Sequence, residues 1–271
     1  MSESKFEARK KEVAREKFYD VDPGHKNLYK VGGSLGMVVG VFYFLVTLIA
    51  YMPGNNGWSE PPFVSAATFI NTLANHARPA YITWSLFTLT DFVAVGVLLA
   101  LYFALKGVNR DAILVGIGIT LMSVILDAAV AEVGFFTATS LAVSWNAATD
   151  PVLKAAYYVA ANHAVLQTEF AWPYSYFAGF TGWIIISAVM RKSSAFGKWL
   201  GTFGLVASSL FVIDMALVYV IPGVAGGFIL PLQWVFVVFW ILAGVRLFSL
   251  GRKKNQLQMG VLTKEQQMLG K

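Results

Sequence analysis

The chain has 271 residues and a net charge of +6; 57% of its residues are hydrophobic and only 13% are charged. A soluble domain carries about a quarter charged residues, so this composition, with its long apolar runs, is typical of a membrane protein. The absence of cysteine excludes disulfides, thiolate metal sites and thiol nucleophiles.

The first thirty residues form a charged arm without an apolar core segment, which argues against a secretory signal peptide. Ser4 and Glu7 have capping-box spacing ahead of a helix-prone stretch, "KFEARKKEVAREKF". We therefore expect residues 1–30 to be a partly helical cytoplasmic arm that lies on the membrane surface or against a partner protein. The alternative is a solvated tail.

Six segments are apolar enough to cross a bilayer as helices, which requires about 20 mostly apolar residues. They are residues 31–52, 81–105, 112–136, 173–190, 199–220 and 227–248. The fourth is short and starts at Pro173, so we expect its helix to begin earlier, near Leu166, and to kink at the proline. The sequence thus predicts an all-α, polytopic membrane bundle over residues 31–248, followed by a basic cytoplasmic tail, 249–271.

Basic residues are distributed unevenly among the connections. With the N-terminus inside, all 21 lysines and arginines except Arg78 and Lys154 lie in or next to the inner segments. This asymmetry follows the positive-inside rule and predicts an even number of spans in the cell membrane, with both termini cytoplasmic. It also explains the positive net charge by contact with anionic lipid, and no basic–aromatic surface indicates nucleic acid as a partner.

Two outer connections are long enough to contain helices. In the first, after the turn-rich run "PGNNGWSEPP", apolar residues recur at helical spacing: Phe63, Ala66, Ala67, Ile70, Ala74 and Ala77. In the second, Asp150 can cap a helix with Pro151 at its first position. One face of that helix carries Val152, Ala156, Val159, His163 and Leu166. We expect both to be amphipathic helices on the outer interface or capping the bundle, with "EFAWPYSYF" (169–177) as an interfacial aromatic belt.

Glycines mark one face of the first span. The run "GGSLG" (32–36) fits the G-x-S-x-G pattern, but it opens a membrane helix and not a strand-to-helix turn. Gly32, Gly36 and Gly40 lie four residues apart, and small residues at this spacing let membrane helices approach closely. We interpret them as a helix-packing face and as a candidate contact for a membrane-protein partner.

Acidic and amide side chains interrupt the apolar spans: Asp91, Asp127, Glu132, Asp214 and Gln233. At 1.5 Å per residue, Asp91 and Asp127 lie roughly 14 Å below the outer surface. Because a charge at mid-bilayer costs several kcal/mol, such residues face the bundle interior or water. Asp127 and Glu132 are five residues apart, so in a regular α-helix they would not share a face.

No span offers these acids an opposite charge at their depth in the bilayer. They can be protonated, hydrogen-bond to neutral groups, or meet a cation from outside the chain, namely a proton, a metal ion or an amine-bearing ligand. The neutral groups within reach are Tyr43, Tyr102, Trp84, Thr88, Ser123 and Tyr219. The alternative to a ligand site is that each aspartate staples neighbouring helices by hydrogen bonds.

Histidines lie outside the spans, which disfavours haem ligation within the bilayer. His76, His163 and Glu169 are weak candidates for a lid or an outer metal shell, although a histidine on an amphipathic helix is more often simply interfacial. No zinc-protease motif, phosphate loop or dinucleotide fingerprint occurs. The sequence therefore identifies no cofactor and no catalytic residue.

Two stretches resemble a known family. "LFTLTDFVAVGVLLALYFALKGVNRDAILVG" (86–116) resembles the second-span signature of a widespread prokaryotic six-helix membrane family, with an aspartate, an apolar run, a tyrosine and a V-N-R turn. "YFAGFTGWIIISAVMRKSSAFGKWLGTFGLVASSLFVIDMALVY" (176–219) is similar to its later helix pair. The family is labelled domain of unknown function 4386. The resemblance implies six helices and singles out Asp91 and Asp214, but it implies no activity.

Three functions remain open. In the first, an outward-facing intramembrane pocket with Asp91, Asp214 and Asp127, helped by Glu132 and Gln233, binds a proton, a cation or a small amine-bearing solute for transport or sensing. In the second, the protein is a non-catalytic accessory subunit of a membrane complex, which the glycine face and the charged arm favour. In the third, it is a membrane enzyme acting on a lipid, quinone or small apolar substrate with the acids as general acid–base groups.

Overall fold

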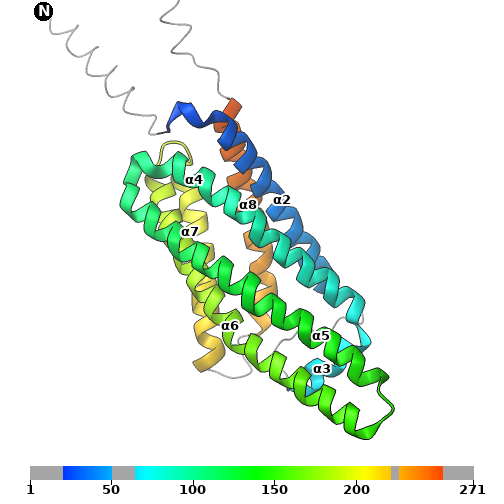
Figure 1. Cartoon of the computed structure of the whole chain (residues 1–271). Helices are drawn as coiled ribbons and strands as arrows, with labels where there is room; N and C mark the ends of the chain where they lie inside the picture. The colour runs from blue at the N-terminus through cyan, green and yellow to red at the C-terminus, as the bar shows by residue number, and fades with distance from the viewer. Residues whose placement is uncertain (1–20, 51–64, 221–225, 253–271) are drawn as a thin grey trace, which may run out of the picture.

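The computed structural model describes residues 21–50, 65–220 and 226–252, and over these ranges the chain is all helical (Figure 1). Three predicted features lie outside the described residues: the arm helix with Ser4 and Glu7, the turn-rich run after Pro53, and the tail beyond Arg252. The structure therefore tests the helical bundle.

Seven α-helices and two short helical turns make up the described residues. In chain order they are η1 (Pro23–His25), α2 (Lys26–Ala50), α3 (Ala66–Asn75), α4 (Ala77–Leu126), the π-helical turn η2 (Asp127–Ala131), α5 (Glu132–Ala147), α6 (Pro151–Lys192), α7 (Gly197–Val220) and α8 (Gly226–Arg252). The backbone of α4 is broken at Asn109, where φ is −159° and ψ is 95°. The Asn109 side chain accepts a hydrogen bond from the N–H of Ala112 at 3.1 Å, as a helix N-cap does. The chain turns back there, so α4 has two arms (Figure 1).

Four helices among the described residues are long and apolar enough to cross a membrane. They are Lys26–Ile49, Ala77–Ala147, Gly197–Leu217 and Leu232–Arg252. The second is a 71-residue stretch that contains the break at Asn109, so it covers both expected spans between residues 81 and 136. The helix α6, which contains the expected span 173–190, is not among the four. The chain is thus a multi-pass protein of a lipid bilayer, and the count of six crossings stays a prediction.

Neighbouring residues of α4 show which way its first arm faces. The side chain of Phe92 is 67% exposed, whereas the residue before it, Asp91, is only 8% exposed. Lipid can cover an exposed phenylalanine in a bilayer, but it cannot solvate a carboxyl group. The arm therefore turns its apolar side chains outward and its carboxyl group into the bundle.

The glycines of α2 pack within the chain itself. A Cβ atom added to Gly36 would lie 3.0 Å from the Cα of Gly244 in α8, and one added to Gly40 would lie 2.6 Å from Ile241 Cγ1. Gly32 lies against α4 in the same way. The expected close helix packing is confirmed. The expectation that this face receives a partner protein is wrong, because α8 and α4 already cover it.

The helix expected in the second connection is not a separate element. As predicted, Asp150 caps it, accepting a hydrogen bond from the N–H of Leu153 at 2.8 Å. It then continues as α6 through Pro173 to Lys192, so the helix that contains the expected fourth span starts much earlier than expected. Proline removes one backbone hydrogen bond but leaves the remaining turns of a long helix in place.

The apolar face predicted for that helix points outward. Val152 is 79% exposed and Val159 is 67% exposed, while the opposite face packs through the small residues Ala161, Ala164 and Val165. A search for large apolar residues misses a packing face made of alanines. This face therefore does not cap the bundle.

The helix α3 confirms the expectation of a helix in the first connection, with a rotated face. Its N-cap, Ser65, accepts a hydrogen bond from the N–H of Thr68 at 3.2 Å. Phe69, Ile70 and Leu73 are buried, whereas Ala67, which was expected on the packing face, is exposed. These three side chains join a second hydrophobic core formed with α4, α5 and α6.

Candidate functional site

The site begins with the Asp91 carboxyl group in the first arm of α4. Its Oδ2 atom is buried and has no hydrogen-bond partner among the described residues. An unpartnered buried oxygen costs about 1–3 kcal/mol, and more if it is charged. A side chain that only stapled two helices would use this atom, so the open oxygen favours a ligand.

A π-helical turn brings the next two acids together. The N–H of Glu132 donates to the carbonyl oxygen of Asp127, five residues earlier, instead of to residue 128. In a regular α-helix, residues five apart differ by about 140° around the axis, whereas a π turn nearly aligns them. The expectation that Asp127 and Glu132 do not share a face is therefore wrong, because it assumed an unbroken α-helix.

Three carboxyl groups thus form one compact group, which we call the acidic triad: Asp91, Asp127 and Glu132. One carboxyl oxygen from each lies within 4.8 Å of the others. In the described ranges, ion pairs are found at Asp22, with His25 at 3.3 Å and Lys106 at 3.2 Å, and none involves the triad. The triad therefore has no protein cation to balance it within the part of the chain that the structure describes.

Neutral donors satisfy little of the triad. Asp127 Oδ1 accepts a hydrogen bond from Ser175 Oγ at 3.2 Å, but the same hydroxyl also donates to the carbonyl oxygen of Trp172 at 2.8 Å. Both carboxyl oxygens of Glu132 are buried without a hydrogen-bond partner among the described residues. The Thr88 hydroxyl adjoins Glu132, yet its proton goes to a backbone carbonyl of its own helix.

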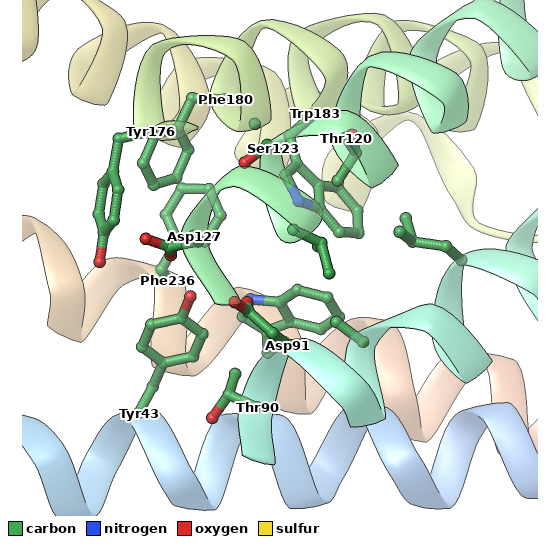
Figure 2. A pocket seen from close by; sticks show the side chains of 15 residues that line it. Tyr43, Thr90, Asp91, Thr120, Ser123, Asp127, Tyr176, Phe180, Trp183 and Phe236 are labelled. Atoms are coloured by element: carbon green, nitrogen blue, oxygen red, sulfur yellow. The ribbon is translucent and has the colours of Figure 1, made fainter. Parts of the chain in front are cut away.

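A cavity of about 60 Å³ adjoins two of the three acids. Figure 2 shows the Asp91 and Asp127 side chains pointing into it, with the Tyr43 hydroxyl group directed toward them. Since one water molecule needs about 10–15 Å³ by this measure, the cavity has room for several waters or a small ligand. Its walls come from α2, α4, α6 and α8.

Asp214 and Gln233 stand apart from the triad. Asp214 in α7 is 4% exposed and its Oδ2 atom lacks a hydrogen-bond partner in the described residues, but it neither joins the triad nor lines the cavity. Gln233 Oε1 accepts a hydrogen bond from Thr47 Oγ1 at 3.1 Å, which links α8 to α2. Similar depth in the bilayer did not bring these side chains to the same place as Asp91.

The two histidines among the weak metal candidates do not join the triad either. His76 ends α3, where its backbone N–H donates to the carbonyl oxygen of Thr72 at 2.9 Å. His163 is exposed on α6. The side chain of Glu169 lies outside the described residues.

Sequence reasoning missed Ser175 and the aromatic walls of the cavity. The stretch 169–177 was expected to be an interfacial belt, and Tyr174 is indeed exposed. Tyr176, two residues later, is buried and lines the cavity. The glycine at 179 was the available signal, because a Cβ there would lie 2.5 Å from the hydroxyl oxygen of Ser123 and so marks where α6 meets α4.

The fold and the buried triad define a multi-pass helical membrane protein with carboxyl groups in its interior. The chain belongs to the family described as Domain of unknown function (DUF4386), which matches residues 38–251. The resemblance drawn from residues 86–116 and 176–219 is thereby confirmed. No curated protein and no solved structure matches the chain.

Proposed function

We propose that this integral membrane protein binds a cation at the acidic triad, as the binding step of transport or sensing. The observation that carries the proposal is the placement of Asp91, Asp127 and Glu132, with carboxyl oxygens within 4.8 Å and no ion pair in the described residues. Like charges this close repel strongly in a medium of low polarity. A bound cation would remove that repulsion and use the open oxygens.

The available donor atoms suit a hard cation or an ammonium group. Carboxylate and hydroxyl oxygens are the ligands that Na⁺-like, Ca²⁺-like and Mn²⁺-like ions prefer. The hydroxyl groups of Tyr43, Ser123 and Ser175 are the neutral oxygens near the acids. π turns also occur frequently at functional sites, which is consistent with the role proposed for η2.

The proposal includes the predicted topology. The two arms of α4 together with α2, α6, α7 and α8 would give six crossings, with both termini cytoplasmic and the cavity facing outward in the cell membrane. The distribution of lysine and arginine supports this orientation, because all but Arg78 and Lys154 would lie in or next to the inner segments.

Neither rival function gains a specific observation. The accessory-subunit hypothesis relied on the glycine face, which α8 and α4 occupy, and on the charged arm, most of which lies outside the described residues. The enzyme hypothesis needs a nucleophile or an electrophilic group beside the acids. No histidine of the described residues joins the triad.

Thermal unfolding of the detergent-purified protein tests the cation site. We would compare Na⁺, Ca²⁺, Mn²⁺ and methylated ammonium ions at constant ionic strength, balanced with N-methylglucamine. A ligand that binds only the folded state raises Tm with its concentration. We expect at least one cation to do so in wild type, and Asp91→Asn to abolish the shift.

Asp214→Asn is the matched control, because Asp214 is as deeply buried as Asp91 and also has an open oxygen. It should leave the shift intact. The proposal fails if no cation raises Tm, or if Asp214→Asn removes the shift as completely as Asp91→Asn does.

A further inference from the structure

Aromatic rings form much of the cavity wall around the two cavity carboxyl groups. The cavity is lined by Tyr43, Tyr176, Phe180, Trp183, Phe236 and Trp240. Figure 2 shows Tyr43, Tyr176 and Phe180 on the same side of the cavity as Asp127. We call these six residues the aromatic wall.

The rings of the wall are fixed by one another. Phe180 stands edge-on to Phe236 with ring centroids 4.7 Å apart, and Trp183 stands edge-on to Trp240 at 4.8 Å. Phe180 also stacks on Phe211 at 4.1 Å, with 10° between the ring planes. Interlocked rings of this kind form a rigid wall, because no ring can turn without displacing its neighbour.

One of the two carboxyl groups beside this wall has an oxygen without a hydrogen-bond partner among the described residues. Asp91 is about nine-tenths buried, its Oδ2 has no hydrogen-bond partner among the described residues, and its side chain points into the cavity (Figure 2). Glu132 does not line the cavity, so the ligand would meet two carboxyl groups, Asp91 and Asp127. A small cation in the cavity would contact both carboxyl oxygens and aromatic ring carbons.

The combination of carboxyl oxygens and ring carbons around the cavity favours an organic cation over a metal ion. Calcium takes six to eight oxygen ligands and magnesium needs near-octahedral oxygen coordination, which ring carbons do not supply. The face of an aromatic ring instead attracts an ammonium group and its methyl substituents, and this is how proteins recognise methylated ammonium ions. The wall therefore suits a cation with its own apolar surface.

We propose that the cation is a small methylated ammonium ion, with its charge at Asp91 and Asp127 and its methyl groups against the aromatic wall. This inference rests on the cation site proposed above and specifies its ligand. The cavity volume of about 60 Å³ restricts the ligand to a few heavy atoms. The paired carboxyl groups disfavour neutral molecules of the same shape, because an uncharged ligand does not balance their negative charge.

Isothermal titration calorimetry of the detergent-purified protein with trimethylammonium tests the inference. The neutral comparison is tert-butanol, which has a similar shape without the charge, and the metal comparison is Mn²⁺. We expect wild type to bind trimethylammonium and not tert-butanol, and to bind it more tightly than Mn²⁺. This comparison needs no variant, so it does not depend on how well a mutant folds.

Two leucine variants then test the aromatic wall. Phe180→Leu removes a ring that lines the cavity and should weaken the binding of trimethylammonium about fivefold. Phe203→Leu is the matched control, since Phe203 is also partly buried and stacked on a ring, Trp199, but does not line the cavity. It should leave the affinity unchanged.

The outcomes separate this inference from the proposed function. Mn²⁺ binding that Asp91→Asn abolishes, without trimethylammonium binding, would overturn the ammonium inference and leave the cation site in place. Binding of neither ion, together with no rise of Tm in Na⁺ or Ca²⁺, would overturn both. Equal binding of trimethylammonium and tert-butanol would show an apolar cavity without charge recognition, which also contradicts both.

Discussion

Asp127 and Glu132 lie on the same side of their helix although they are five positions apart, because the Glu132 N–H donates to the Asp127 carbonyl oxygen. A π turn is equivalent to one extra residue inserted into an α-helix. The surplus residue rotates Asp127 relative to the helix that follows. The position of the triad therefore depends on the length of the segment "DAAVA" as much as on its acids.

Deleting Ala129 should convert this turn to regular α-helix. The helix α5 would keep its packing, because the surplus residue is the one removed, and the two acids would become four residues apart. Deleting Ala142 in the regular part of α5 should rotate all that follows by about 100° and prevent folding. Size-exclusion profile and Tm of the two deletions would measure the difference. Equal damage by both deletions would mean that the π turn is not a removable insertion.

Asp91→Asn should not destabilise the protein when cations are absent. The substitution replaces a buried carboxyl group whose Oδ2 has no partner in the described residues and keeps the shape of the side chain, so we expect the free energy of unfolding to stay the same or to rise by about 1–2 kcal/mol. Gln233→Leu, which breaks the bond from Thr47, should lower the stability by about 1 kcal/mol. Thermal unfolding in N-methylglucamine buffer checks both. A clear loss of stability in Asp91→Asn would indicate a helix staple.

The first span was predicted well because its signal is local. A run of about 20 mostly apolar residues and glycines at every fourth position can be recognised from the sequence alone. Gly36 and Gly40 do pack against a helix. Which helix they meet depends on the tertiary fold, and so the partner-protein expectation failed.

Much of the site could not be predicted for the same reason. The carboxyl of Asp91 was recognisable from its apolar surroundings, but its neighbours come from helices whose rotation the sequence does not encode locally. Depth alone grouped Asp91 with Asp214, but Asp214 neither joins the triad nor lines the cavity. The π turn changes the face of Asp127 without an unusual residue, since "DAAVA" also suits an α-helix.

Gly36→Leu should separate α2 from α8. The new side chain would meet the backbone of Gly244, which cannot move away as a flexible side chain could, and we expect a loss of about 1–3 kcal/mol or more. Gly118→Ala is the control, because nothing lies within 4 Å of the added Cβ and alanine favours the helix. Tm of the two variants gives the comparison. A tolerated leucine at position 36 would show that α2 and α8 are not tightly packed.

The ion pair of Asp22 should make a small, pH-dependent contribution to stability. The hydrogen bond from the Gly24 N–H and the Lys106 ammonium lower the pKa of the Asp22 carboxyl below its ordinary value of 3.8. A lowered pKa in the folded state means that the contribution is present above pH 3.8 and is lost as the pH falls through the lowered value. Asp22→Asn should thus lower Tm at neutral pH and match wild type in strong acid.

Comparing Asp22→Asn with Lys106→Met and the double variant isolates the pair. We expect the double variant to lose less stability than the sum of the losses in the two single variants. Full additivity at neutral pH would show that Asp22 and Lys106 do not interact in solution.

The helix α6 contributes to both the second hydrophobic core and the aromatic wall of the cavity. Its 42 residues would make a rod about 63 Å long, roughly twice the hydrocarbon thickness of a bilayer. The same rod carries Tyr176 and Phe180 of the aromatic wall. It therefore links the end of α6 that Asp150 caps to the cavity wall within one continuous helix.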